Sequence, residues 1–125
     1  MQRCLLVNQR SQGNSYEKIA AKFLEEKGFS IVEFNFFSKI GELDIIAKDG
    51  EYLVFVEVKY RKNKSKGSAA EAVTFSKMKK ICRTADYYML THNLTDSTSV
   101  RFDVIAIEEG KLTHFPNAFE YIPIR

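Results

Sequence analysis

The fold of this chain is decided by residues 41–61, which read GELDIIAKDGEYLVFVEVKYR. Apolar and β-branched residues fill both halves of this stretch, and the Asp49-Gly50 dipeptide between them is typical of a β-hairpin turn. The second half, residues 51–60, is apolar on both faces at its centre, as in a strand that is covered from both sides. The stretch therefore predicts a hairpin whose second strand lies inside a sheet.

The register of this hairpin determines which polar side chains meet. If the chain turns at Asp49-Gly50, the numbers of facing residues sum to 99, and Glu42 lies opposite Glu57. Asp44, Glu57 and Lys59 then share one face, with the two carboxylates as diagonal neighbours. Glu57 and Lys59 also interrupt an apolar strand, where charges are costly unless they are paired or bind a cation. We expect either a salt-bridge cluster of these three residues or a cation site.

Two carboxylates that converge on one point repel each other, and a hard divalent cation removes that repulsion. Mg²⁺ or Mn²⁺ is the expected cofactor because such ions take oxygen ligands. Lys59 is placed to balance the charge that develops on an attacked phosphate. Asp44, Glu57 and Lys59 are therefore the candidate catalytic residues.

The whole sequence, residues 1–125, predicts a single α/β domain with a mixed central sheet flanked by helices. Asn14 and Glu17 have the spacing of a capping box for a helix over residues 15–27 that ends at Gly28. The other expected elements are strands at 29–37, 42–48 and 51–60, a helix at 76–90, a strand at 100–107 and a short terminal strand around 112–115. The predicted order is αβββαβ plus the terminal strand.

Positive charge is concentrated in residues 59–83, which carry a net charge of +8, while the whole chain carries only +3. A surface polarised in this way is typical of proteins that bind polyanions, although a solvated basic loop has the same composition. We expect nucleic acid to be the partner. The candidate contact residues are Arg61, Lys62, Lys64, Lys66, Lys77, Lys79, Lys80 and Arg83.

Membrane insertion and export are not expected. The longest apolar runs have four residues, against roughly 20 in a membrane helix and roughly 7 to 15 in a signal-peptide core. The two cysteines, Cys4 and Cys82, lack the spacing of a zinc site. These observations predict a cytoplasmic protein with no membrane contact, and they are compatible with either a monomer or a homodimer.

The hairpin motif resembles that of a known group of nucleases. The segment 41–47 followed by 54–61 is similar to the D-(spacer)-ExK core of the PD-(D/E)XK superfamily, and most closely to the YraN-like family of bacterial proteins. The spacer between Asp44 and Glu57 is also similar to that of archaeal Holliday-junction resolvases. The chain departs from the family pattern at Phe37, where the family usually has an arginine.

The resemblance implies a restriction-endonuclease-like fold and a set of roles. Asp44, Glu57 and the backbone carbonyl of Val58 would bind the metal, and Lys59 would assist the attacking water. Glu17 is implied as a further acidic ligand, although its place in the capping box is an alternative reason for a glutamate there. The implied function is metal-dependent, endonuclease-like phosphodiester hydrolysis of DNA. The alternative is a catalytically inactive nucleic-acid-binding module of the same fold.

Overall fold

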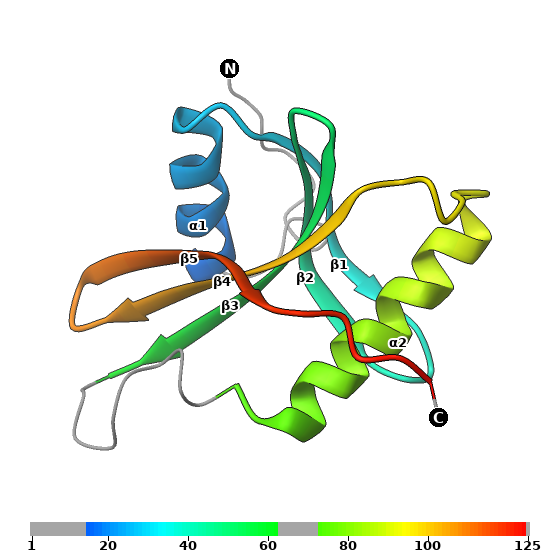
Figure 1. Ribbon diagram of the computed structural model, residues 1–125. Helices are drawn as coiled ribbons and strands as arrows, with labels where there is room; N and C mark the ends of the chain where they lie inside the picture. The colour runs from blue at the N-terminus through cyan, green and yellow to red at the C-terminus, as the bar shows by residue number, and fades with distance from the viewer. Residues whose placement is uncertain (1–14, 63–72, 125) are drawn as a thin grey trace.

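The computed structural model describes residues 15–62 and 73–124, which form a mixed α/β structure around one sheet (Figure 1). Its elements are α1 (Ser15–Glu26), β1 (Ser30–Phe37), β2 (Glu42–Asp49), β3 (Tyr52–Arg61), α2 (Phe75–Thr91), β4 (Val100–Glu108) and β5 (Lys111–Phe119). The five strands lie in sequence order, with β3 and β4 parallel and the other neighbours antiparallel. The predicted fold class and order of elements are confirmed.

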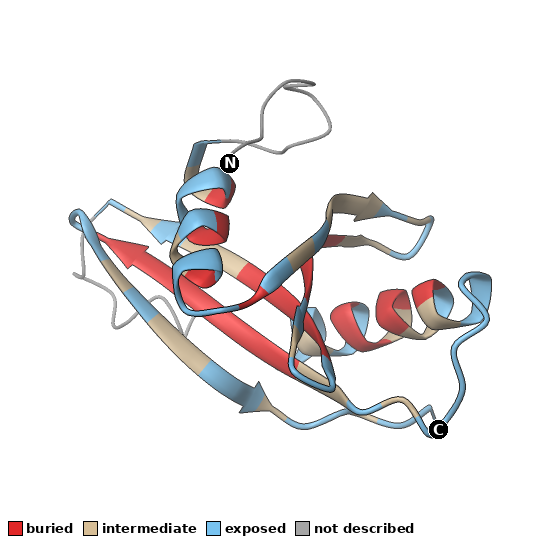
Figure 2. Cartoon of the chain, turned by 90° about the horizontal axis from the view of Figure 1, so that it is seen from above, coloured by how far each residue is buried: buried red, intermediate tan, exposed pale blue. Residues whose placement is uncertain are grey.

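The two helices cover opposite faces of the sheet. Val54 and Val56 of β3 belong to the apolar cluster that includes Ala20 and Leu24 of α1. The alternate β3 residues, Leu53 and Phe55, belong to a second cluster with the α2 residues Ile81, Cys82, Ala85 and Tyr88. The buried stretch of the sheet accordingly runs between the two helices (Figure 2). β3 is the central strand of the sheet, as the sequence predicts.

The hairpin of β2 and β3 has a different register from the predicted one. Asp49 pairs with Tyr52 and Ile46 with Phe55, so that the numbers of paired residues sum to 101 rather than 99. The turn is Gly50-Glu51, and Gly50 adopts a φ of 61°, which is unstrained for glycine at the first central position of a tight turn. The prediction was therefore wrong by two residues. A shift of two leaves every side chain on its predicted face.

β1 and β2 also share an irregularity that the sequence pattern does not predict. Phe34 and Phe36, two apart in β1, would share a face in a regular strand. Instead Phe34 packs in the α1 cluster and Phe36 in the α2 cluster, and their β2 partners, Ile45 and Leu43, divide in the same way. Asn35, between the two phenylalanines, has a φ of 50°, a conformation that asparagine tolerates better than most residues. The alternation of both strands breaks at this level of the sheet.

β5 is longer than the short strand predicted around residues 112–115, because it continues past Pro116 to Phe119. Proline has no N–H to donate to a ladder and is found at sheet edges and bulges. β5 lies at the edge of the sheet, and its register with β4 shifts beside Asp103. Pro116 therefore interrupts the pairing without ending the strand.

The side chain of Asp103 fills this irregularity. Its buried carboxylate accepts hydrogen bonds from Arg101 Nε and Nη2 at 2.9 and 3.0 Å, from His114 Nε2 at 2.8 Å and from the backbone N–H of Asn117 at 2.9 Å. Burial alone would raise the pKa of Asp103, but the hydrogen bonds from His114 and Arg101 outweigh it and lower the pKa. The network joins β4 to β5.

Two sequence-based predictions concern residues outside the described ranges. These are the helix cap at Asn14 and the loop lysines Lys64 and Lys66. The start of α2 is described: Thr74 accepts a hydrogen bond from the backbone N–H of Lys77 at 3.1 Å and caps the helix. Within the described ranges, no helix is long and apolar enough to span a membrane.

Candidate functional site

The candidate site lies where β2 separates from β3. Their backbone pairing extends from the turn to Ile45 and Val56. One residue further, Oδ2 of Asp44 accepts a hydrogen bond from the backbone N–H of Val58 at 2.8 Å, so that a side chain occupies the place of a ladder partner. An open cavity of about 500 Å³ lies at this fork. Its lining residues are Glu17, Asn35, Phe37, Glu42, Asp44, Glu57, Val58, Lys59 and Tyr60.

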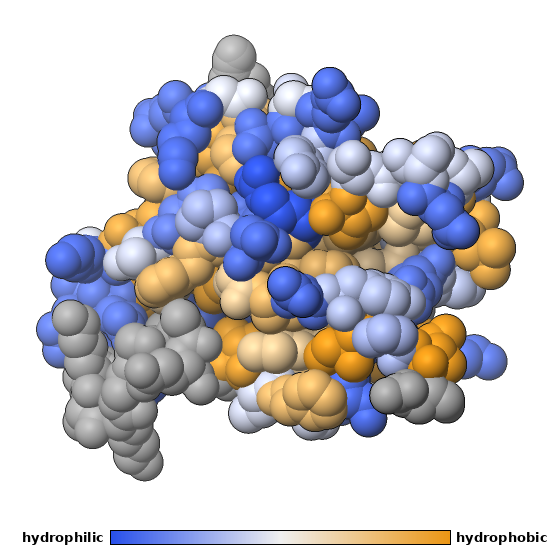
Figure 3. All heavy atoms as spheres, viewed as in Figure 1, coloured by the Kyte–Doolittle hydropathy of each residue, from blue (hydrophilic) through white to orange (hydrophobic). Residues whose placement is uncertain are grey.

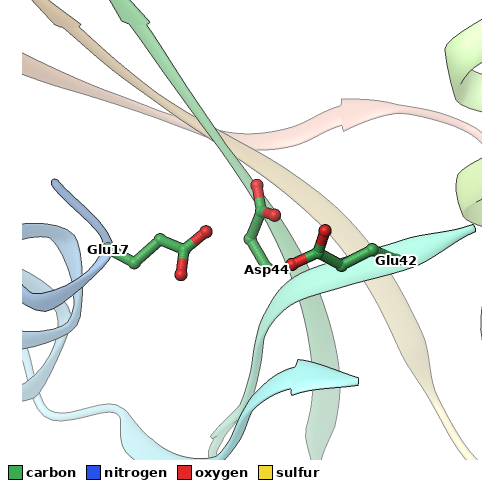
Figure 4. A group of neighbouring side chains, drawn as sticks. All are labelled: Glu17, Glu42 and Asp44. Carbon is green, nitrogen blue, oxygen red and sulfur yellow. The ribbon is translucent and has the colours of Figure 1, made fainter. Parts of the chain in front are cut away.

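Three carboxylates converge in the cavity. Glu17 reaches it from α1, whereas Glu42 and Asp44 belong to β2, and one carboxylate oxygen from each lies within 4.8 Å of the others (Figure 4). Asn35 connects two of them, because its Nδ2 donates to Glu17 Oε1 at 3.0 Å and to Glu42 Oε2 at 2.6 Å. The residue with the unusual φ, Asn35, is therefore also the one that holds Glu17 and Glu42 in place.

Glu57 is a fourth carboxyl group, directly beside Asp44. Only 7% of Glu57 is exposed. Burial, reinforced by the negative charge of Asp44, raises the pKa of Glu57 to about 8. Burial also raises the pKa of Asp44, and the two side chains are hydrogen-bonded to each other. Without a cation, the raised pKa of Glu57 favours its protonated form at neutral pH.

The lysine that pairs with Glu57 is Lys77. Its Nζ lies 3.6 Å from Oε2 of Glu57 and reaches the site from the first turn of α2. Lys59 lines the cavity, and its charge also lowers the pKa of Glu57, though by less than that of Lys77. The salt-bridge alternative predicts Lys59 as the ion-pair partner of Glu57. The structure instead pairs Glu57 with Lys77.

The other candidate nucleic-acid residues differ in their surroundings. Arg61 is half-buried at the end of β3. Arg83 is bound to the C-terminal segment: its guanidinium lies 3.1 Å from Asp86, donates to the backbone carbonyl of Ile122 and covers the ring of Tyr121. Of the candidate residues that the structure describes, Lys62, Lys77, Lys79 and Lys80 are exposed to solvent.

Sequence reasoning brought Asp44, Glu57, Val58, Lys59 and Glu17 into one site, and all five line the cavity. It assigned no role to Glu42 or Asn35. Strand alternation already places Glu42 on the face of Asp44 and Glu57, whereas the positive φ of Asn35, whose amide contacts Glu17 and Glu42, does not follow from an alternating pattern. The available signal was an asparagine inside a strand of aromatic residues, since asparagine is among the few residues that adopt positive φ.

Comparison with known proteins gives a family. The sequence profile described as "Uncharacterised protein family UPF0102" matches residues 16–107. The chain belongs to the UPF0102 family. It is 42% identical to a UPF0102 protein of Lachnoclostridium phytofermentans, over 91% of this chain and 97% of that protein. It is also 44% identical to a UPF0102 protein of Clostridioides difficile, over 90% of this chain and the full length of that protein.

Membership of the YraN-like family, predicted from the hairpin motif, is thereby confirmed. The segment that defines UPF0102 contains every residue of the cavity lining, from Glu17 to Tyr60. Carboxylate oxygens are the ligand type that Mg²⁺ and Mn²⁺ prefer. Three such oxygens within 4.8 Å of one another repel unless they are protonated or bind a cation. The donor set of this UPF0102 protein therefore fits a hard divalent cation.

Proposed function

We propose that this UPF0102 protein is a metal-dependent phosphodiester hydrolase that acts on DNA. The observation that carries the proposal is the convergence of Glu17, Glu42 and Asp44 in the same open cavity as Glu57 and Lys59. A structural ion-pair cluster has no need of so many acids, because each further buried carboxylate costs free energy. Several acids beside one lysine suit a site that binds a cation and a phosphate.

Each side chain has a distinct role in this proposal. Glu42 and Asp44 hold the cation together with Glu17, and Asn35 keeps Glu17 and Glu42 in orientation through its two hydrogen bonds. The cation supplies Lewis-acid chemistry, which activates water and offsets charge on the phosphate.

Glu57 and Lys59 act on the reacting groups. In the absence of the cation, Glu57 would hold a proton next to Asp44, and a bound cation would favour the ionised form of Glu57. The ammonium of Lys59, on the cavity wall, faces the phosphate and stabilises the negative charge that develops there.

The basic surface beside the cavity completes the proposed interface. Lys62 follows β3, and Lys79 and Lys80 lie on the exposed side of α2. Lysine side chains in such positions contact phosphates and fix the position of the strand without reading bases. We infer that these lysines hold the DNA backbone while the carboxylates act on one phosphodiester.

A cleavage assay with several forms of DNA tests the proposal. Purified protein is incubated with supercoiled plasmid, linear duplex and circular single-stranded DNA, with Mg²⁺, Mn²⁺ or EDTA. We expect cleavage of at least one form that requires the cation and is lost in Glu57→Gln. The matched control is Glu25→Gln, because Glu25 is an exposed glutamate of α1 outside the cavity lining. Metal-independent binding with no cleavage of any form would favour the inactive nucleic-acid-binding module.

A further inference from the structure

An exposed aromatic ring stands at the edge of the carboxylate cavity. Phe37 is the last residue of β1, lines the cavity and is 68% exposed. Its Cα partner across the hairpin is Glu42. Side chains that are paired in this way share a face and lie close together. The ring of Phe37 therefore stands next to a carboxylate of the proposed metal site.

A second aromatic surface borders the same cavity. Tyr60, near the end of β3, lines the cavity and is 42% exposed. Its ring is stacked on that of Tyr16 from α1, with centroids 3.9 Å apart and planes inclined by 16°. This stack fixes the orientation of Tyr60. The cavity thus has charged groups at its centre and aromatic rings on two strands at its border.

Single exposed apolar residues are common and carry no meaning by themselves. The position of Phe37 is informative because most of the other residues that line the cavity are charged or polar, whereas the other β1 phenylalanines, Phe34 and Phe36, pack into the two apolar clusters. A ring beside a phosphate-binding centre suits a ligand that has a phosphate and a flat apolar face a few ångströms apart. A nucleotide is such a ligand, because every base has a π-face that stacks on aromatic side chains.

We propose that Phe37 and the stacked pair Tyr60–Tyr16 form a base-binding subsite, and that the DNA strand is unpaired at the phosphodiester that is cleaved. This inference rests on the proposed function and specifies its substrate. In a duplex both faces of a base are covered by its neighbours, so only an unpaired base can lie against these rings. The volume of about 500 Å³ is in the range of pockets that hold small molecules.

Binding measurements in EDTA test the subsite separately from cleavage. The ligands are a fluorescent single strand of about 20 nucleotides and a hairpin duplex of the same composition. The length of the single strand exceeds the usual footprint of a single-strand-binding domain. We expect Phe37→Leu, which keeps apolar volume but removes the ring, to weaken single-strand binding about tenfold and to change duplex binding less than twofold. Phe37→Tyr keeps the ring and should bind as the parent does.

A spectroscopic measurement reports the stacking directly. A single strand that contains 2-aminopurine should lose fluorescence on binding the parent protein and Phe37→Tyr, and lose less on binding Phe37→Leu. The control is Tyr52→Leu, since Tyr52 is an exposed aromatic residue at the opposite end of β3 and outside the cavity lining. It should behave as the parent does.

Two results would overturn the subsite. The first is that Phe37→Leu binds the single strand and quenches 2-aminopurine as strongly as the parent does. The second is that the parent and Phe37→Leu both cleave linear duplex as fast as single strands. Neither result would affect the proposed hydrolase activity. That activity would instead fail if no form of DNA were cleaved with either metal.

Discussion

At the scale of single residues, Glu57 links the candidate site to the stability of the protein. Its pKa of about 8 in the folded state lies above the 4.5 of an ordinary glutamate. A raised folded-state pKa contributes stability below pH 4.5, and that contribution is lost as the pH rises through 8. We therefore expect the metal-free protein to lose about 2 to 4 kcal/mol of unfolding free energy between pH 5 and pH 8.5.

Urea unfolding in EDTA across this pH range measures the effect, and Glu57→Gln provides the comparison. The glutamine cannot ionise, so the pH dependence of this variant should be flatter. Added Mg²⁺ should restore stability to the parent at high pH, since a ligand that binds only the folded state stabilises it. Parallel pH curves for parent and variant would contradict the raised pKa of Glu57.

The two lysines near Glu57 are expected to differ. Lys77 is the ion-pair partner, but 46% of its side chain is exposed, so Lys77→Met should cost less than about 1 kcal/mol of stability. It should also raise the pKa of Glu57 further, because the charge of Lys77 lowers it. The pH at which stability is lost should then move upward.

Lys59→Met should leave stability nearly unchanged and slow cleavage by about 100-fold, as when a group that stabilises transition-state charge is removed. Single-turnover rates at saturating protein measure this loss. Lys22→Met, at an exposed lysine of α1, is the matched control. Parental cleavage by Lys59→Met would remove Lys59 from the mechanism.

At the scale of the elements, the site depends on the irregularity that β1 and β2 share. Asn35→Ala and Asn35→Gly both remove the hydrogen bonds to Glu17 and Glu42, but only glycine accepts a φ of 50° without strain. Asn35→Ala should therefore be about 1 kcal/mol less stable than Asn35→Gly.

Both Asn35 variants should bind Mg²⁺ about 10- to 100-fold more weakly, because groups that orient metal ligands have effects of this size. Titration calorimetry and thermal melts separate the two quantities. Metal affinity that follows stability, rather than the loss of the amide, would contradict an orienting role for Asn35.

The elements also show how far sequence reasoning reaches. The order and type of the strands and helices were predicted correctly, with β5 predicted too short, because alternation, turn residues and apolar periodicity are local properties. The predicted register of the hairpin differed from the observed one by two residues, because Asp49-Gly50 and Gly50-Glu51 are both plausible turns. Asp44 and Glu57 nevertheless stayed on a common face because the error was even. The role of Asn35 was missed because a change of face within a strand depends on tertiary packing.

At the scale of the whole molecule, the polarised charge predicts binding that weakens steeply with salt. Each lysine that contacts a phosphate should contribute about one unit to the slope of log affinity against log salt. Lys79→Ala with Lys80→Ala should therefore reduce the slope by about two. Arg83→Ala should leave it unchanged, because Arg83 is bound to Asp86 and Ile122. Fluorescence anisotropy at several salt concentrations measures both slopes.

This contrast marks a second limit of sequence reasoning. A sum of charges along residues 59–83 treats Arg83 and Lys80 alike. In the structure Arg83 is bound to the C-terminal segment, whereas Lys80 is exposed to solvent. This difference depends on the packing of residues some 40 positions further along the chain. An equal loss of slope for Arg83→Ala would show that its contacts open when DNA binds.

The network around Asp103 makes His114 a natural spectroscopic probe of the intact fold. The ammonium of Lys27, 2.9 Å away, can only donate, so Nδ1 of His114 accepts and Nε2 carries the hydrogen that is directed at Asp103. The side chain of His114 is 4% exposed, which shields that hydrogen from exchange with water. A slowly exchanging imidazole N–H signal should therefore appear in nuclear magnetic resonance spectra and report the docking of α1 on β5 in every variant made at the carboxylates of the cavity.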